Sequence, residues 1–385
     1  MLQIDHVYEF FYENIFKDFS VCHFPGGVPK LTNLTQADLY IFTKSLYNLK
    51  IFFYDQEPII PNIVNEYFIM TKLWMNKEET IMCVSEHSTE VTQYKTLYYF
   101  FHGFAALDWY RGYHALNYNK SIVKEYKHDY ITFNRIINHD RSYRIYFVSL
   151  LKAQGLLEDG LVSFGVTDNL FDDWRDEVAD PNTKLSEHAR QHAKLHLTDI
   201  SRLVIDHAEL LGSASASIPR TIDCWMLPDF PSPPNVDAFW HIVTETVFYY
   251  DKLHLTEKIF KPIVSKQPFM LLAAPGNLAY LRSYGFKTFD SVIDESYDNI
   301  LDNDARIEAV VDQLHWYCNL TPGEKTDVIK QLEPIIQHNF DHFYGEFRHI
   351  ITRELLSNTK SLFKTIDYSG QKNIKWDNIY KILTK

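Results

Sequence analysis

Residues 254–278, HLTEKIFKPIVSKQPFMLLAAPGNL, decide the predicted fold of this chain. Thr256 is a favourable N-cap residue, which would place Glu257 and Lys258 at the first positions of a helix. Pro262 has no amide donor and should kink or shorten that helix. The proline-flanked run FMLLAA then predicts a buried strand, and Pro-Gly-Asn predicts a turn into another helix.

The same alternation of helical patterns and short apolar runs continues along the rest of the chain. It is typical of an α/β protein with parallel sheets. Polar residues follow the first of these runs, and ligands bind at the carboxyl ends of strands in open α/β sheets, so these residues are site candidates. The predicted strands lie at 49–59, 80–88, 96–110, 130–135, 160–165 and 239–248.

Chain length and one charged stretch predict the domain organisation. The 385 residues exceed what one ordinary core holds, so two domains are expected. The charged stretch KSIVKEYKHD separates two series of strands and helices. We therefore expect an N-terminal Rossmann-like domain at 1–127, a C-terminal domain at 128–350, and a helical segment at 351–385 that packs back on the N-terminal domain.

Charge and cysteine usage narrow the class of protein. The net charge of −12 would repel nucleic acid, although residues 351–385 carry seven Lys or Arg against three acids. The ordinary interpretation of that segment is a solvated basic tail. Four separated cysteines without a CxxC spacing, no long apolar run and no signal-peptide pattern predict a cytoplasmic protein without a membrane partner.

The Glu257–Lys258 pair has a chemical interpretation of its own. A helix start offers unpaired N–H groups and positive partial charge, which attract an anion. Lys258 is unfavourable for the helix dipole there, so its presence suggests a bound anion such as a phosphate. Glu257 is suited to accept hydrogen bonds from the vicinal hydroxyls of a ribose. The alternative is a surface pair on an ordinary amphipathic helix.

A family resemblance adds to this interpretation. VTETVFYYDKLHLTEKIFKPI resembles the donor-site motif of α1,3-fucosyltransferase-type glycosyltransferases. The chain as a whole resembles a family of phage and large-virus glycosyltransferases, with the patterns DQEP at 55–58, TEK-F-KP at 256–262 and GFKTF at 285–289. The resemblance covers most of residues 50–290. It implies the GT-B fold, in which two Rossmann-like domains face each other across a cleft and C-terminal helices cross back.

The resemblance also implies donor-binding roles for individual residues. Glu257 and Lys258 would bind the ribose and the phosphates of a nucleotide sugar, and Glu245 would lie at the donor. Thr246 and Val247 stand where fucosyltransferases have Asn-Ser, so the sugar need not be fucose.

The resemblance further implies that an arginine opening the first helix of the donor domain contacts the diphosphate, which a guanidinium can hold in bidentate fashion. Arg141 and Arg144 compete for this role. Arg144 is better placed relative to the following Leu-Leu, and Arg135 is a third candidate.

Transfer with inversion requires a base that deprotonates the acceptor hydroxyl. We expect Asp108 in this role, with Glu57 second. Trp109 and Tyr110 would stack on an acceptor ring, and His102 lies in the same run. A reaction with retention of configuration needs no such base. Asp55, Glu86 and His87 are further candidates at strand ends.

We expect no cofactor and no divalent metal. The resemblance implies that Arg and Lys can neutralise the leaving diphosphate, as in fucosyltransferase-like enzymes, and the chain has no clear Asp-x-Asp loop. The acidic residues of FDDWRDE (171–177) are interpreted as a solvent-exposed helix face. His188, His192 and His196 recur every four residues, a spacing that can bind a transition metal, but a half-buried polar stripe is the default interpretation.

The sequence therefore predicts a glycosyltransferase that uses a nucleotide-sugar donor. The expected acceptor is a hydroxymethylated base of phage duplex DNA, with a glycan or a protein as the alternative. A non-catalytic sugar-nucleotide-binding module is a further alternative. A Rossmann-type dehydrogenase is disfavoured because no GxGxxG follows an early strand.

Overall fold

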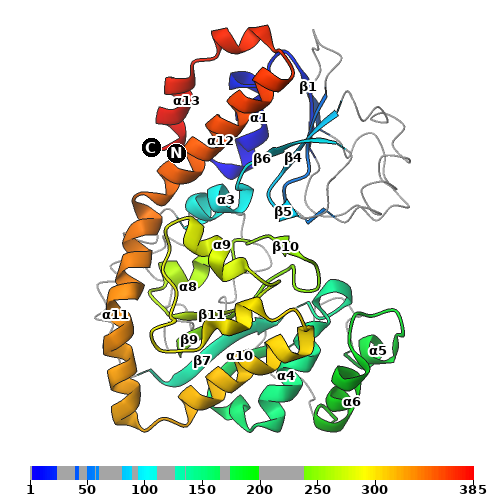
Figure 1. Cartoon of the computed structure of the whole chain (residues 1–385), viewed down its shortest axis with the longest axis vertical. Coiled ribbons are helices and arrows are strands. Elements are labelled where there is room, and N and C mark those ends of the chain that lie inside the picture. The colour runs from blue at the N-terminus through cyan, green and yellow to red at the C-terminus, as the bar shows by residue number, and fades with distance from the viewer. Residues whose placement is uncertain are drawn as a thin grey trace. The chain divides into compact units, whose positions relative to one another are not determined.

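The computed structural model describes ten segments of the chain and divides it into two compact units (Figure 1). The described segments are 2–23, 40–42, 50–56, 58–59, 80–88, 94–110, 126–134, 136–164, 174–198 and 238–385. Unit 1 joins Met1–Asp108 to Gly345–Lys385, and unit 2 is Trp109–Tyr344. Each unit contains a sheet built mainly of parallel strands, so the predicted mixed α/β class is confirmed.

The sheet of unit 1 has five strands, of which β2 is antiparallel to its neighbour β1 and the others are parallel. Their order is β2 (Tyr40–Phe42), β1 (Ser20–His23), β3 (Lys50–Phe53), β4 (Thr80–Val84) and β6 (Lys95–Tyr98). All of β4 is buried, as expected for an inner strand of a parallel sheet. A short strand, β5 (His87–Ser88), follows it.

Aromatic side chains fill the core of unit 1. Phe11 of α1 (Val7–Asn14) stacks on Phe53 with ring centroids 5.7 Å apart. Phe363 of α12 (Phe347–Thr365) lies parallel to the ring of Phe19 at 5.8 Å. Helix α13 (Trp376–Leu383) packs against α12, and α12 packs against β6. The high aromatic content of the chain therefore serves packing here.

One predicted strand of unit 1 is too long. The sequence predicts strand over 96–110, but the strand ends at Tyr98 and α3 (Phe101–Trp109) follows. The run is apolar almost throughout, and eight of the nine residues of α3 are buried. A fully buried helix has no polar face, so hydrophobic periodicity cannot separate it from a strand.

The sheet of unit 2 has four parallel strands whose carboxyl ends share one edge. Their order is β11 (Phe269–Leu272), β9 (Ala238–Thr244), β7 (His128–Asn134) and β8 (Gly160–Phe164). Thr244 pairs with Leu272 and Asn134 with Phe164, so the last residues of neighbouring strands lie in register. The predicted strands at 130–135, 160–165, 239–248 and FMLLAA are confirmed, with shifted ends.

Helices cover the sheet of unit 2, and α4 and α10 cross one of its faces side by side (Figure 1). Helix α4 also packs against α6, and α11 packs against α8. The α-helices that the structure describes in unit 2 are α4 (Tyr143–Ala153), α5 (Trp174–Ala179), α6 (Glu187–His196), α8 (Phe260–Val264), α9 (Asn277–Ser283), α10 (Asn303–Cys318) and α11 (Pro322–Tyr344). Helix α4 ends before Gly155, whose φ of 73° suits glycine.

The unit boundaries differ from the predicted domain limits. Unit 2 begins at Trp109, whereas the charged stretch placed the boundary near residue 127, and the chain returns to unit 1 at Gly345, before the expected residue 351. A charged stretch marks solvated chain, whereas a compact unit is defined by packing. None of the helices in the described segments has both the length and the apolar composition needed to cross a membrane.

Candidate functional site

Unit 2 contains a cavity of about 250 Å³ at the carboxyl edge of its parallel sheet. Phe133 and Thr244 line it from the ends of β7 and β9. Residues 256–258, here called the TEK turn, contribute Glu257 and Lys258, and Lys261 lines it from α8. The place is the one that open α/β sheets commonly use for ligands.

The sequence predicts that the TEK turn is the first turn of a helix, and this prediction is wrong. Helix α8 begins at Phe260 and has five residues. Residues 257–259 form a turn in which Phe260 N donates to Glu257 O at 3.3 Å and Lys261 N to Lys258 O at 3.2 Å. Pro262 lies inside this short helix, in agreement with the expected shortening. The helix-dipole explanation for Lys258 therefore does not apply.

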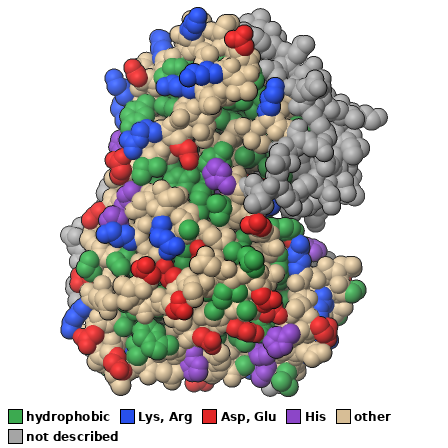
Figure 2. All heavy atoms as spheres, viewed as in Figure 1, with side chains coloured by type: hydrophobic (Ala, Val, Ile, Leu, Met, Phe, Trp, Pro, Cys, Tyr) green, Lys and Arg blue, Asp and Glu red, His purple; other side chains and the backbone are tan. Residues whose placement is uncertain are grey.

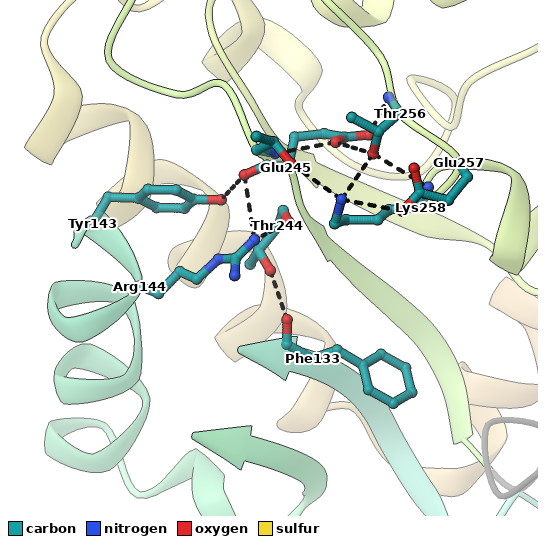
Figure 3. Close-up of polar contacts among 9 residues, drawn as sticks. Phe133, Tyr143, Arg144, Thr244, Glu245, Thr256, Glu257 and Lys258 are labelled. Carbon is teal, nitrogen blue, oxygen red and sulfur yellow. Dashed lines mark hydrogen bonds and ion pairs between the residues drawn. The ribbon is translucent and has the colours of Figure 1, made fainter. Parts of the chain in front are cut away.

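The buried carboxylate of Glu245 holds the TEK turn in place (Figure 3). Its Oε1 accepts from Thr256 N at 3.1 Å, and its Oε2 accepts from the Thr256 hydroxyl at 2.6 Å and from Thr246 N at 3.2 Å. Glu245 is fully buried and is not among the residues that line the cavity. Its carboxylate thus acts on the turn that carries Glu257 and Lys258.

The ammonium of Lys258 has three protein partners (Figure 3). Nζ donates to Thr246 Oγ1 at 3.1 Å, to Thr256 Oγ1 at 3.0 Å and to Glu257 Oε1 at 3.4 Å. The side chains of Glu257 and Lys258 are 27% and 37% exposed, and both residues line the cavity. The pair therefore faces a cavity and does not stand on an open surface.

The two competing arginines differ in what they contact. Arg144 is 3% exposed, and its guanidinium donates to Ile136 O at 2.8 Å and to Thr244 O at 2.7 Å. Arg144 thereby links the carbonyl group of Ile136, which follows β7, to that of Thr244, the last residue of β9. Arg141, at the end of the 3-10 helix η4 (His139–Arg141), is partly exposed and lines the cavity. Arg141 is thus better placed to meet a ligand than Arg144, and Arg135 lies outside the described residues.

Sequence reasoning missed two titratable residues of the cavity, Lys261 and His241. Lys261 Nζ lies 4.1 Å from the centroid of the Phe133 ring, and burial lowers the pKa of this lysine to about 8. Burial, together with the nearby charge of Lys261, lowers the pKa of His241 to about 3, so this imidazole is neutral at pH 7. Lys261 follows the TEK turn in the TEK-F-KP pattern, which was the available signal.

The charge of the lining favours an anionic ligand. Among the described residues that line it, the cationic side chains are those of Arg141, Arg144, Lys258 and Lys261, and the only carboxylate is that of Glu257. Hydroxyl groups of Thr244 and Thr246 add neutral polar atoms. An excess of cations in a partly enclosed site suits phosphate, because charge-assisted hydrogen bonds are stronger there than in water.

The candidate bases belong to unit 1. Asp108 is 6% exposed, and its Oδ2 accepts from Ile4 N at 3.0 Å, so one oxygen anchors the N-terminal segment. His102 is buried in the same helix, α3. Asp55 is buried and accepts from the hydroxyls of Tyr8 and Tyr99. Burial raises the pKa of Asp55 to about 6. Glu57 lies outside the described residues.

The expected acceptor-stacking residues lie at the start of unit 2. Tyr110 is buried and lines the cavity, and its carbonyl accepts from the Tyr344 hydroxyl at 2.9 Å. Burial raises the pKa of Tyr110, and the charge of Glu257 adds to this effect. Trp109 is partly buried and is not among the lining residues.

Two of the three histidines of α6, His188 and His192, contact helix α4. The hydroxyl of Tyr146 lies 3.0 Å from His188 Nε2, and Ser149 Oγ lies 2.9 Å from His192 Nδ1. The rings of His192 and His196 have centroids 4.4 Å apart. Within the segments that the structure describes, no group of three or more His, Cys, Asp or Glu has the geometry of a metal site.

Comparisons with family models, with curated proteins and with solved structures gave no match to this chain. The functional assignment that follows therefore rests on the geometry and charge of the cavity.

Proposed function

We propose that the chain is a glycosyltransferase of GT-B type that moves a sugar from a nucleotide-sugar donor to a hydroxyl acceptor. The cavity of unit 2 would bind the diphosphate and ribose of the donor. The observation that carries this proposal is the collection of Arg141, Lys258 and Lys261 around one carboxylate, Glu257, at the carboxyl edge of a parallel sheet. The resemblance of the TEK-F-KP pattern to a donor-site motif supports the same assignment.

The donor chemistry suggests roles for Arg141 and Glu257. Breaking the anomeric C–O bond passes through an oxocarbenium-like transition state, and negative charge develops on the departing diphosphate. A guanidinium at Arg141 can neutralise that charge in bidentate fashion. Glu257 can accept two hydrogen bonds from the ribose hydroxyls. No metal is required for charge neutralisation in this scheme.

The volume of the cavity limits how much of the donor it can enclose. Its volume of about 250 Å³ is just below the range of roughly 300–1,000 Å³ typical of pockets that enclose a whole small molecule. A diphosphate with its ribose fits this volume, and the remainder of the donor would extend beyond it.

The acceptor and the base are further parts of the proposal. Asp108 stays the first candidate for the base and Glu57 the second. One oxygen of Asp108, Oδ2, already accepts from Ile4 N. Occupation of one oxygen by the backbone also favours the alternative of a non-catalytic sugar-nucleotide-binding module, which would keep the cavity and lack a working base.

The proposed acceptor is a hydroxymethylated base of duplex DNA, with a glycan as the alternative. Figure 2 shows Lys and Arg side chains over the C-terminal helices of unit 1, where phosphates of DNA could bind. Exposed lysines of this segment are Lys372, Lys375 and Lys381. A target base in a duplex would have to leave the stack or be reached in a groove.

A thermal-shift screen of sugar nucleotides and nucleoside diphosphates tests the donor site, and transfer assays on modified duplex DNA and on glycans then test the acceptor. We expect at least one sugar nucleotide to raise the melting temperature, and Glu257→Gln to reduce that shift. Glu333→Gln, a change of the same chemistry on α11, is the matched control. If no sugar nucleotide and no nucleoside diphosphate stabilises the wild-type chain, the proposal is wrong. Binding without transfer or donor hydrolysis would support the non-catalytic module.

A further inference from the structure

We infer that Lys261, and not Lys258, is the lysine that contacts the anionic group of the ligand in the cavity of unit 2. Lys258 is instead a positioning residue that holds the TEK turn. The inference deepens the proposed function and rests on it, because it assumes that the cavity takes a phosphate or diphosphate.

The hydrogen bonds of Lys258 leave no donor for a ligand. A lysine ammonium has three N–H donors. In Lys258 they meet three acceptors, the hydroxyl oxygens of Thr246 and Thr256 and the carboxylate of Glu257. Turning Nζ towards a phosphate would break at least one of these contacts. It would also loosen the Glu257 side chain that the proposed function needs for the ribose.

Lys261 has the opposite arrangement. It is three residues further along the chain and lines the same cavity. Its Nζ lies over the face of the Phe133 ring at 4.1 Å from the centroid. Among the described residues, none accepts a hydrogen bond from this ammonium or places a carboxylate within ion-pair distance of it. Its N–H donors are therefore available to a ligand, and an aromatic face alone does not replace the hydration that the ammonium loses.

The surrounding charges favour an anion at Lys261. Burial is the main cause that lowers its pKa to about 8, the charge of Lys258 lowers it further, and the carboxylate of Glu257 opposes both effects. Arg141 and Arg144 also line the cavity, and His241 is neutral at pH 7. A phosphate bound against Lys261 would offset the cost of keeping this ammonium charged, so binding and protonation should be linked.

Titration calorimetry with inorganic pyrophosphate as the probe tests the inference on the full chain. We expect Lys261→Gln to weaken binding by about tenfold or more, the loss of one charge-assisted hydrogen bond. Lys287→Gln is the matched control, because Lys287 is an exposed lysine of the same unit that does not line the cavity. Lys258→Gln should weaken binding less than Lys261→Gln. The melting temperature of each variant shows whether it is folded.

The pH dependence of pyrophosphate affinity is a second test, because a purely structural role of Lys261 would not change it. Lys261→Arg keeps its charge at every pH used, because a guanidinium does not titrate. The affinity of the wild type relative to Lys261→Arg should fall between pH 7 and pH 9, since Lys261 loses its proton around its pKa of about 8. Titration of pyrophosphate itself cancels in this ratio. A constant ratio would overturn the inference.

The possible results separate the inference from the proposed function. If the wild type binds pyrophosphate and Lys261→Gln binds it equally well, Lys261 is not the contact and the proposed function stands. The same holds if only Lys258→Gln loses binding. If the wild type binds neither pyrophosphate nor any nucleoside diphosphate, the proposed function is wrong, and the inference is wrong with it.

Discussion

Replacing Thr256 by valine should destabilise unit 2 more than replacing it by serine. Thr256 is 2% exposed, and its hydroxyl donates to the buried carboxylate of Glu245 at 2.6 Å while accepting from Lys258 Nζ at 3.0 Å. Valine keeps the shape of threonine and removes the hydroxyl. Serine keeps the hydroxyl and removes one methyl group.

The expected magnitudes follow from these contacts. A hydrogen bond to a charged group contributes about 1.5–3 kcal/mol, and Thr256→Val removes one such bond from a buried carboxylate. Thr256→Ser removes one buried methyl group, a loss of about 0.8 kcal/mol. The free energy of unfolding should therefore fall in the order wild type, Thr256→Ser, Thr256→Val. If side-chain packing alone mattered at this position, the two variants would exchange places.

Urea unfolding followed by tryptophan fluorescence measures this order. Trp240, on β9 of the same unit, is fully buried and reports on the region. Each variant should shift the midpoint without changing the slope of the transition. The reasoning is refuted if Thr256→Ser is less stable than Thr256→Val, or if Thr256→Val unfolds at the wild-type midpoint.

The remaining predictions concern unit 1. Asp108→Asn should abolish transfer and leave donor affinity intact, since the amide oxygen can still accept from Ile4 N; retained turnover in a transfer assay would shift the role of base to Glu57. For Asp55, the folded pKa of about 6 lies above the ordinary aspartate pKa of 3.8, so the native state binds the proton more tightly than the unfolded state. The free energy of unfolding therefore falls as pH rises from about 4 to 6. Between pH 4 and 6 the free energy of unfolding of the wild type should fall by on the order of 2–3 kcal/mol relative to that of Asp55→Asn. The same pH dependence of unfolding in the two proteins would contradict this. Three exposed C-terminal lysines are Lys372, Lys375 and Lys381. Neutralising all three should lower any DNA affinity and make it depend less on salt concentration. An unchanged salt dependence would show that they do not contact phosphate.

The fold class and most strands of unit 2 could be predicted from the sequence because their signal is local. A buried parallel strand is a short continuous apolar run, and β9 is buried at all seven of its positions. The same signal failed for α3, because a helix buried on nearly all sides carries no alternation. The end of α4 has a local cause as well, because the helix stops just before Gly155, a residue that adopts positive φ without strain.

The turn that precedes α8 depends on Glu245, which lies eleven positions before Thr256. Thr256 is a favourable N-cap residue, and its hydroxyl accepts from Lys258 N at 3.4 Å. Its amide and hydroxyl also donate to the carboxylate of Glu245, and residues 257–259 form a turn. Local propensity cannot include the contact with Glu245, because only the folded chain brings the end of β9 to this turn. The place of Glu245 outside the cavity lining has the same cause.

The sequence by itself determined the residue types of the candidate site: a carboxylate and lysines in one short segment that follows a buried strand. Only the tertiary structure decided which of those groups are already occupied. Lys258 and Lys261 are three residues apart and chemically alike, yet one ammonium meets three oxygen acceptors and the other lies on an aromatic ring. The physical reason is that hydrogen-bond partners are set by distances in space, and Thr246 and Phe133 come to these lysines from the ends of two different strands.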